Sequence, residues 1–197
     1  MFGSDGIQTF LSIAIGLGLA AACGFRVFIP LLIAGSAARL GHLQLAADFQ
    51  WLASVPALLA LGTAAVLEVG AYYIPWLDHA LDMVATPAAV VAGILASASV
   101  LHGVPPVLRW VLPVIGGGAS AGLIQGVSVL FRLKSTTLTG GVANPIVSTA
   151  ELVGAAFMTL LAIVFPLVCL ALVGVLLVFA FRATGRIIFG RPPTMTN

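Results

Sequence analysis

Apolar runs that approach the ~20 residues needed to cross a bilayer as an α-helix constrain this chain more than any other feature. Charged residues make up 7% of its 197 residues, against roughly a quarter in a soluble domain, and the mean hydropathy is +1.19. Alternating strands of about ten residues, which a transmembrane barrel would need, do not occur in the sequence. We therefore expect an all-α integral membrane protein with one membrane domain over residues 1–197 and the lipid bilayer as its surroundings.

Five runs are predicted to be firm transmembrane helices: residues 7–22, 51–73, 85–102, 111–131 and a run within 151–181. The last run is longer than a bilayer core at about 1.5 Å per residue, so it must tilt, kink at Pro166 or divide into two. Residues 27–38 are apolar but short, and residues 145–164 could cross the membrane or re-enter it. We count these as one or two broken or re-entrant segments, because non-helical backbone at membrane depth must be buried in protein or face water.

An internal repeat is one interpretation of the pattern. The stretch SVPALLALGTAAVLEV at residues 54–69 is echoed by VFPLVCLALVGVLLVF at residues 164–179. The repeat units would be residues 7–73 and 111–181, and the extra run between them would invert the second unit, as in many transporters. Chance similarity between two apolar runs is the alternative.

Basic residues gather after the last run and after the fourth run: Arg182, Arg186, Arg191, Arg132 and Lys134. Because Lys and Arg are enriched on the cytoplasmic side of membrane proteins, we expect the C-terminus in the cytoplasm and the chain in a bacterial inner membrane. Both groups lie on that side only if the chain crosses an even number of times between them. This favours two passes after Asn144, or one segment that dips and returns.

Gly118, Gly122 and Gly126 recur every four residues in GGGASAGLIQG. On a helix they form one small-residue face, which lets a neighbouring helix approach closely. The face could belong to this chain or to a second copy, so a homo-oligomer is one expectation. A phosphate-binding loop is disfavoured, because the segment lacks the Lys-Ser/Thr ending of that motif.

Arg26 interrupts an apolar stretch, AAACGFRVFIPLL, at residues 20–32. An arginine at mid-membrane costs roughly 3 kcal/mol on insertion scales. Gly24 permits unusual backbone angles and Pro30 suits the first turn of a helix, so the pattern indicates a helix break with Arg26 beside unpaired backbone groups. Two interpretations stay open: Arg26 belongs to a polar site at this break, or it extends from the end of the first helix into the lipid headgroups.

Acidic residues gather in LEVGAYYIPWLDHALD, residues 67–82. Glu68 has apolar neighbours on both sides, so a buried carboxylate that binds and releases a proton is one hypothesis. Asp78 and Asp82 are four residues apart and would share a helix face, although solvated carboxylates in an interfacial loop explain them equally well. Together with His79 they are ligand types for a divalent ion, but they lack a diagnostic spacing and we predict no metal site.

The stretch ANPIVSTAELVG around Asn144 predicts the start of a helix, with Asn144 as N-cap and Pro145 in the first position. Ser148 and Glu151 lie within two turns of that start. A helix N-terminus inside a membrane protein suits an anion or a polar ligand. The alternative is an ordinary helix start at the membrane–water interface that binds no ligand. Glu151 could pair with Arg26.

No catalytic set is recognised in the sequence. Cys23 and Cys169 lie within apolar runs with no histidine nearby. We expect small buried thiols, and a disulfide between them is the alternative. We therefore predict no enzyme activity and no cofactor. The basic residues are too few and too scattered for a nucleic-acid surface.

Three stretches, AAACGFRVFIPLLIAGSAARLGHL, FQWLASVPALLAL…LEVGAYYIPWLDHALD and TGGVANPIVSTAELVGA, are similar to domain-of-unknown-function family 4126. The resemblance covers roughly residues 8–178 and implies a small multi-pass membrane protein, with no activity to carry over. The matching motif positions are Arg26, Pro30, Arg39, Glu68, Pro75, Asp78, Asp82, Asn144, Pro145, Ser148 and Glu151. The family often has a second acid after this last glutamate, whereas Leu152 follows it here, which weakens a paired-carboxylate site.

Transport is the function that these patterns favour. Broken helices could line a path for a small solute or an ion, with a carboxylate that takes up and releases protons. The residues predicted to line the path are Arg26, Glu68, Asp78, Asp82, Asn144, Ser148 and Glu151. The alternative is a membrane module that does not transport, and instead assembles with a partner or binds lipid.

Overall fold

The computed structural model describes residues 4–71, 75–140 and 144–188, and no strand occurs among them, which confirms the all-α class. The elements in chain order are α1 (Ser4–Cys23), α2 (Phe28–Arg39), the 3-10 helix η1 (Ala47–Ala53), α3 (Val55–Ala71), α4 (Pro75–Ser99), α5 (Leu108–Leu112), the π-helical turn η2 (Pro113–Gly117), α6 (Gly118–Thr139), α7 (Asn144–Val164) and α8 (Pro166–Ile188).

Three stretches of helix are long and apolar enough to cross a membrane within the described residues: Gly6–Cys23, Leu108–Thr139 and Pro145–Val164. The second of these runs through α5, η2 and α6. The apolar parts of α4 and α8, Met83–Ser99 and Pro166–Arg182, are shorter. The prediction of five firm transmembrane helices is therefore wrong in number, although an integral membrane protein is what the apolar helices support.

Two of the predicted runs are divided in the structure. The run 51–73 bends by 65° between η1 and α3, because Ser54 ends η1 and its hydroxyl accepts a hydrogen bond from the Ala57 amide at 3.3 Å, which begins a new helix. The run 151–181 divides at Phe165, immediately before Pro166, into α7 and α8. Residues 145–164 are one continuous helix, and residues 27–38 form the short helix α2.

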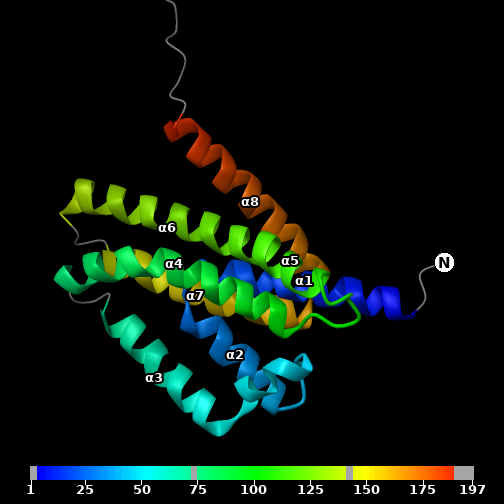
Figure 1. The fold of residues 1–197 in the computed structure, drawn as a ribbon. Helices are drawn as coiled ribbons and strands as arrows, with labels where there is room; N and C mark the ends of the chain where they lie inside the picture. Colours follow the sequence, from blue (N-terminus) through cyan, green and yellow to red (C-terminus); the bar gives the residue numbers. More distant parts are fainter. Residues whose placement is uncertain (1–3, 72–74, 141–143, 189–197) are drawn as a thin grey trace, which may run out of the picture.

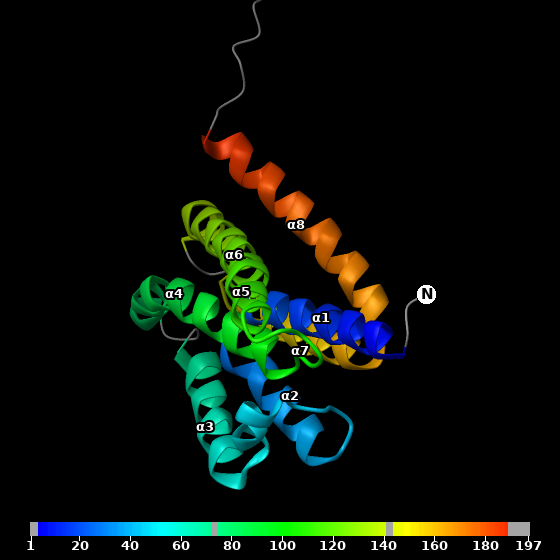
Figure 2. The same ribbon diagram turned by 45° about the vertical axis from the view of Figure 1, so that its right-hand side comes forward.

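Helix α1 lies at the centre of the bundle, in contact with α2, α4, α6, α7 and α8. Figure 1 shows it passing between these elements, and the rotated view in Figure 2 places α2 and α3 on one side of the bundle and α8 on the other. The last turns of α1, from Leu19 to Cys23, are fully buried.

Cys23 and Cys169 are both buried and free, as expected from the sequence. The predicted repeat of residues 7–73 and 111–181 stays a prediction.

Glycines allow a close helix contact between α4 and α6. A Cβ atom on Gly93 of α4 would lie 2.5 Å from the Ala121 Cβ atom and 2.9 Å from the Gly117 carbonyl oxygen. Real Cβ atoms do not approach other atoms this closely, so this crossing requires glycine. Close approach of small residues gives membrane helices van der Waals contact that lipid cannot replace.

The predicted small-residue face on α6 is used within the chain at two of its three positions. A Cβ atom on Gly118 would lie 3.2 Å from Ile94, and one on Gly122 would lie 3.1 Å from Val90, both on α4. Gly126 has open space around it. The homo-oligomer expected from this face stays a prediction.

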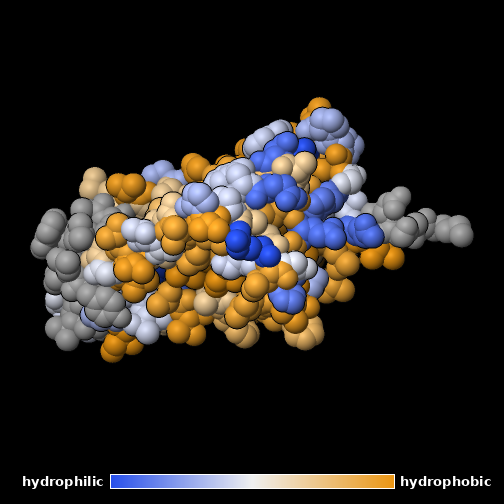
Figure 3. Space-filling model, turned by 90° about the horizontal axis from the view of Figure 1, so that it is seen from below, coloured by the Kyte–Doolittle hydropathy of each residue, from blue (hydrophilic) through white to orange (hydrophobic). Residues whose placement is uncertain are grey.

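The connections at one end of the bundle are polar and well packed. Asp48 of η1 forms an ion pair with Arg109 of α5 at 2.9 Å, and the Phe49 and Trp110 rings lie 6.3 Å apart. Figure 3 shows hydrophobic residues over most of one face and hydrophilic residues gathered toward one end. Trp51 and Trp110 are half exposed, in keeping with aromatic side chains at a membrane–water boundary.

Candidate functional site

The helix break predicted around Arg26 is present. The backbone of α1 closes with hydrogen bonds from the Gly24 amide to the Ala21 carbonyl and from the Phe25 amide to the Ala22 carbonyl, and α2 begins at Phe28. The Arg26 side chain lies at this break and is 1% exposed. Because it is enclosed by protein, the interpretation that Arg26 extends into lipid headgroups is wrong.

Glu68 of α3 reaches the same break and binds the start of α2. Its Oε1 atom accepts a hydrogen bond from the Val27 amide at 2.8 Å, and its Oε2 atom accepts one from the Phe28 amide at 3.1 Å. The first amides of a helix have no partner inside the helix, and α2 has no capping side chain of its own at Val27. The carboxylate therefore takes the place of the cap, at the end of the helix where the backbone dipoles favour a negative charge.

Glu151 of α7 is held by two arginines. Arg132 of α6 donates from Nε to Glu151 Oε1 at 3.1 Å and from Nη2 to Oε2. Arg26 Nη2 lies 3.5 Å from the same Oε2 atom. It also donates to the Ser148 carbonyl at 2.9 Å and to the Ser148 hydroxyl, one turn before Glu151 on α7. The pairing of Glu151 with Arg26 that the sequence allowed is present.

Side-chain contacts join Arg26, Arg132 and Glu151, and Glu68 binds the backbone amide that follows Arg26. We call these four residues the charge cluster. Each is at most 6% exposed. Two positive and two negative charges leave the charge cluster formally neutral. Buried charges in proteins are tolerated when they are paired or hydrogen-bonded, as Arg26, Arg132 and Glu151 are with one another and Glu68 is with two backbone amides.

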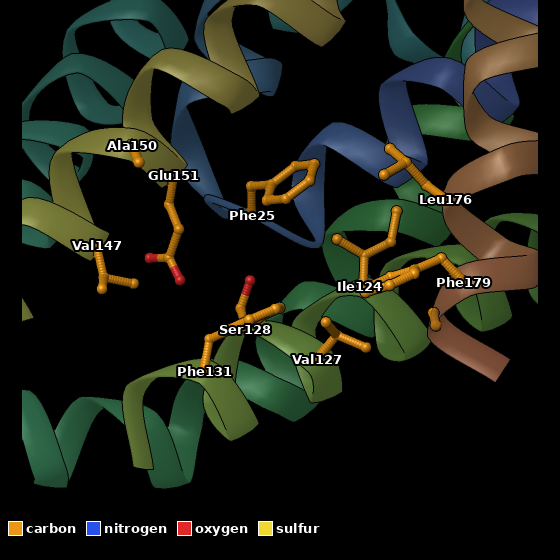
Figure 4. Close-up of a pocket in the computed structure, with 11 residues that line it drawn as sticks. Phe25, Ile124, Val127, Ser128, Phe131, Val147, Ala150, Glu151, Leu176 and Phe179 are labelled. Carbon is orange, nitrogen blue, oxygen red and sulfur yellow. The ribbon is translucent and has the colours of Figure 1, made fainter. Parts of the chain in front are cut away.

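A cavity of about 240 Å³ lies beside the charge cluster, between α6, α7 and α8. Its walls are apolar, with Phe25 contributed by the segment between α1 and α2. Its polar lining consists of Ser128 and Glu151. Figure 4 shows the Glu151 carboxylate and the Ser128 hydroxyl facing each other across this space. The charge cluster is therefore not sealed off, because one of its carboxylates also lines a cavity.

The structure brings together four of the seven residues predicted to line a path, namely Arg26, Glu68, Ser148 and Glu151. Asp78 and Asp82 belong to the first turns of α4, and Asn144 is the first residue of α7. The side chains of these three lie outside the described residues, so their predicted roles stay predictions.

Arg132 is the member of the charge cluster whose burial the apolar pattern does not predict. Its place after the fourth apolar run predicts a basic residue on the cytoplasmic side, but α6 continues to Thr139 and Arg132 is buried within it. The signal that could have located it is its spacing from Gln125 and Ser128, since residues three and four apart share a helix face. All three are buried. One of the basic residues that favoured a cytoplasmic C-terminus is therefore buried in the bundle, and that orientation stays a prediction.

A family model described as Domain of unknown function (DUF4126) matches residues 13–186 of the chain. Neither the curated proteins nor the solved structures contain a match.

Proposed function

Because the chain belongs to the DUF4126 family, whose description names no activity, we propose a function from the site itself: transport of a small solute or ion across the membrane, coupled to proton binding by buried carboxylates. The observation that carries this proposal is the charge cluster of two arginines and two glutamates, enclosed in the bundle where α1 breaks and next to a cavity.

A purely structural role explains the charge cluster poorly. Buried ion pairs can often be replaced by apolar residues of similar volume without loss of stability, and an arginine inside the membrane carries a cost of roughly 3 kcal/mol. Ionisable residues within membrane bundles commonly mark a substrate, ion or proton pathway. Broken helices that present backbone groups at depth are a frequent element of transporter sites.

Glu68 supplies the coupling in this proposal. As a carboxylate it holds the first two amides of α2. A proton on Glu68 removes the negative charge that the start of α2 favours, and thereby weakens the link between α2 and α3. Helix α3 packs mainly on α2 and η1, so a change at Glu68 allows α3 to move relative to the rest of the bundle.

The substitution Glu68→Gln tests the proposal, because glutamine keeps the size and a hydrogen-bond acceptor but does not bind a proton at neutral pH. Purified protein is placed in vesicles that contain a pH-sensitive dye, and sugars, amino acids, alcohols, carboxylic acids and inorganic anions are added one at a time. We expect at least one solute to change the internal pH, and Glu68→Gln to abolish that change.

The matched control is Asp48→Asn, which makes the same chemical change in an exposed ion pair outside the charge cluster, and it is expected to behave like the unmodified chain. Gel filtration shows whether each variant remains folded. Two results count against transport: no solute gives a change beyond that of protein-free vesicles, or folded Glu68→Gln protein retains the full response.

A further inference from the structure

We propose that the cavity between α6, α7 and α8 binds a small neutral molecule that has an apolar body and one hydrogen-bond donor, and that this molecule enters from the bilayer. The inference deepens the proposed function, since such a molecule would be the transported solute. Binding can nevertheless be measured without transport.

The size and walls of the cavity define the body of the ligand. Its volume is about 240 Å³, and an apolar cavity of about 150 Å³ is enough to hold benzene. Ile124, Val127 and Leu176 form part of its walls. A body about as large as a substituted benzene ring therefore fits, and an extended polar molecule would leave its polar groups without partners.

Two side chains define the polar group of the ligand. Ser128 is 5% exposed as a residue, and within the described part of the chain its hydroxyl forms no hydrogen bond and stays accessible from the cavity. Figure 4 shows it pointing into the cavity toward Glu151. An ionised carboxylate has acceptor sites for about four hydrogen bonds, and Arg132 and Arg26 use only part of this capacity. A ligand hydroxyl can therefore donate to Glu151 and accept from Ser128.

The charge cluster argues against a charged ligand. The negative charge of Glu151 is already matched by Arg132 and Arg26. An organic cation in the cavity would approach these two guanidinium groups from the far side of the carboxylate, and an organic anion would meet the carboxylate first. Buried charges without a partner are costly, so a neutral donor is the group that this lining accommodates.

The position of the cavity defines the route of entry. Phe131 of α6 and Phe179 of α8 line it and are 53% and 54% exposed. The outer surface that they share with other exposed apolar side chains faces hydrocarbon in a membrane. A molecule that partitions into the bilayer consequently reaches the cavity from the side, between α6 and α8.

Photolabelling of the full chain in phosphatidylcholine nanodiscs tests this site. The probe is a phenyl trifluoromethyl diazirine that carries a hydroxymethyl group, and mass spectrometry locates the labelled residues. We expect labelling of cavity residues on α6, α7 and α8. An excess of benzyl alcohol should suppress it, while toluene, benzylamine and benzoate, which keep the ring but change the polar group, should have little effect.

The variant Ser128→Ala should lower cavity labelling by about fivefold, the effect of one lost hydrogen bond. Labelling of Val66 on the exposed face of α3 serves as the internal control and should not change. Labelling spread equally over α3 and the cavity would overturn the site. Equal competition by toluene would show that the cavity recognises only the apolar body, and would overturn the proposed hydrogen-bond donor. Stronger competition by benzylamine or benzoate would overturn the proposal that the ligand is neutral. Competition by benzyl alcohol without any solute-driven pH change would support the site while contradicting transport.

Discussion

The substitution Glu151→Leu is expected to lower the free energy of unfolding by about 3–5 kcal/mol, the range measured when one partner of a buried ion pair is removed. The reason is that Arg26 and Arg132 both use this carboxylate, and a leucine leaves them buried without it. The measurement is reversible unfolding of the purified chain in detergent micelles, followed by circular dichroism.

Asp48→Leu is the matched control, because it removes the acidic partner of another arginine, Arg109, in an ion pair that is open to solvent. Surface ion pairs contribute about 0–1 kcal/mol, so this variant should unfold almost like the unmodified chain. Equal losses from Asp48→Leu and Glu151→Leu would contradict a buried charge cluster.

The substitution Gly93→Ala is expected to destabilise the bundle by about 1–3 kcal/mol or more, the usual cost of overpacking. The added Cβ atom would lie 2.5 Å from the Ala121 Cβ atom and 2.9 Å from the Gly117 carbonyl oxygen. Because one of these contacts is with backbone, no side-chain rotation relieves it, and α4 must move away from α6. Thermal unfolding in detergent micelles measures the effect.

Gly174→Ala provides the control, since it makes the same change in α8 where no atom lies within 4 Å of the added Cβ. Alanine is the better helix former by about 1 kcal/mol, so Gly174→Ala should be neutral or stabilising. A melting temperature for Gly93→Ala that equals or exceeds that of Gly174→Ala would show that α4 and α6 do not cross at these glycines.

Local backbone chemistry made the helix breaks predictable from the sequence. Gly24 and Pro30 indicated the end of one helix and the start of another around Arg26, and both lie where α1 gives way to α2. Asn144 and Pro145 indicated a helix start, and α7 begins there. Glycine and proline act on their own backbone, so their effect does not depend on distant parts of the chain.

The number of membrane helices was less predictable, because the hydropathy of a run does not show whether the helix within it keeps one direction. The apolar run 51–73 reads as one span, yet Ser54 ends one helix and begins another at an angle of 65°. The run 151–181 offered tilting, kinking and division equally, and the structure shows division before Pro166.

The membership of the charge cluster was predictable only in part. Arg26 and Glu151 stood out because charges are rare in this chain, but their pairing joins residues more than a hundred positions apart, which no local pattern specifies. Glu68 has backbone amides as partners. Every residue type other than proline has such an amide, so the sequence does not show which one a side chain binds. Arg132 lies after an apolar run, where a charge is ordinarily taken as interfacial.

The coupling between Arg26 and Glu151 tests the central claim most directly, namely that charges distant in sequence meet inside the membrane bundle. Unfolding free energies are measured for Arg26→Met, Glu151→Leu, the double variant and the unmodified chain. Residues in one ion-pair network show coupling of about 0.5–3 kcal/mol, and we predict a value above about 1 kcal/mol, with the double variant more stable than the two separate losses imply. Losses that add within about 0.3–0.5 kcal/mol, as for independent sites, would contradict the charge cluster.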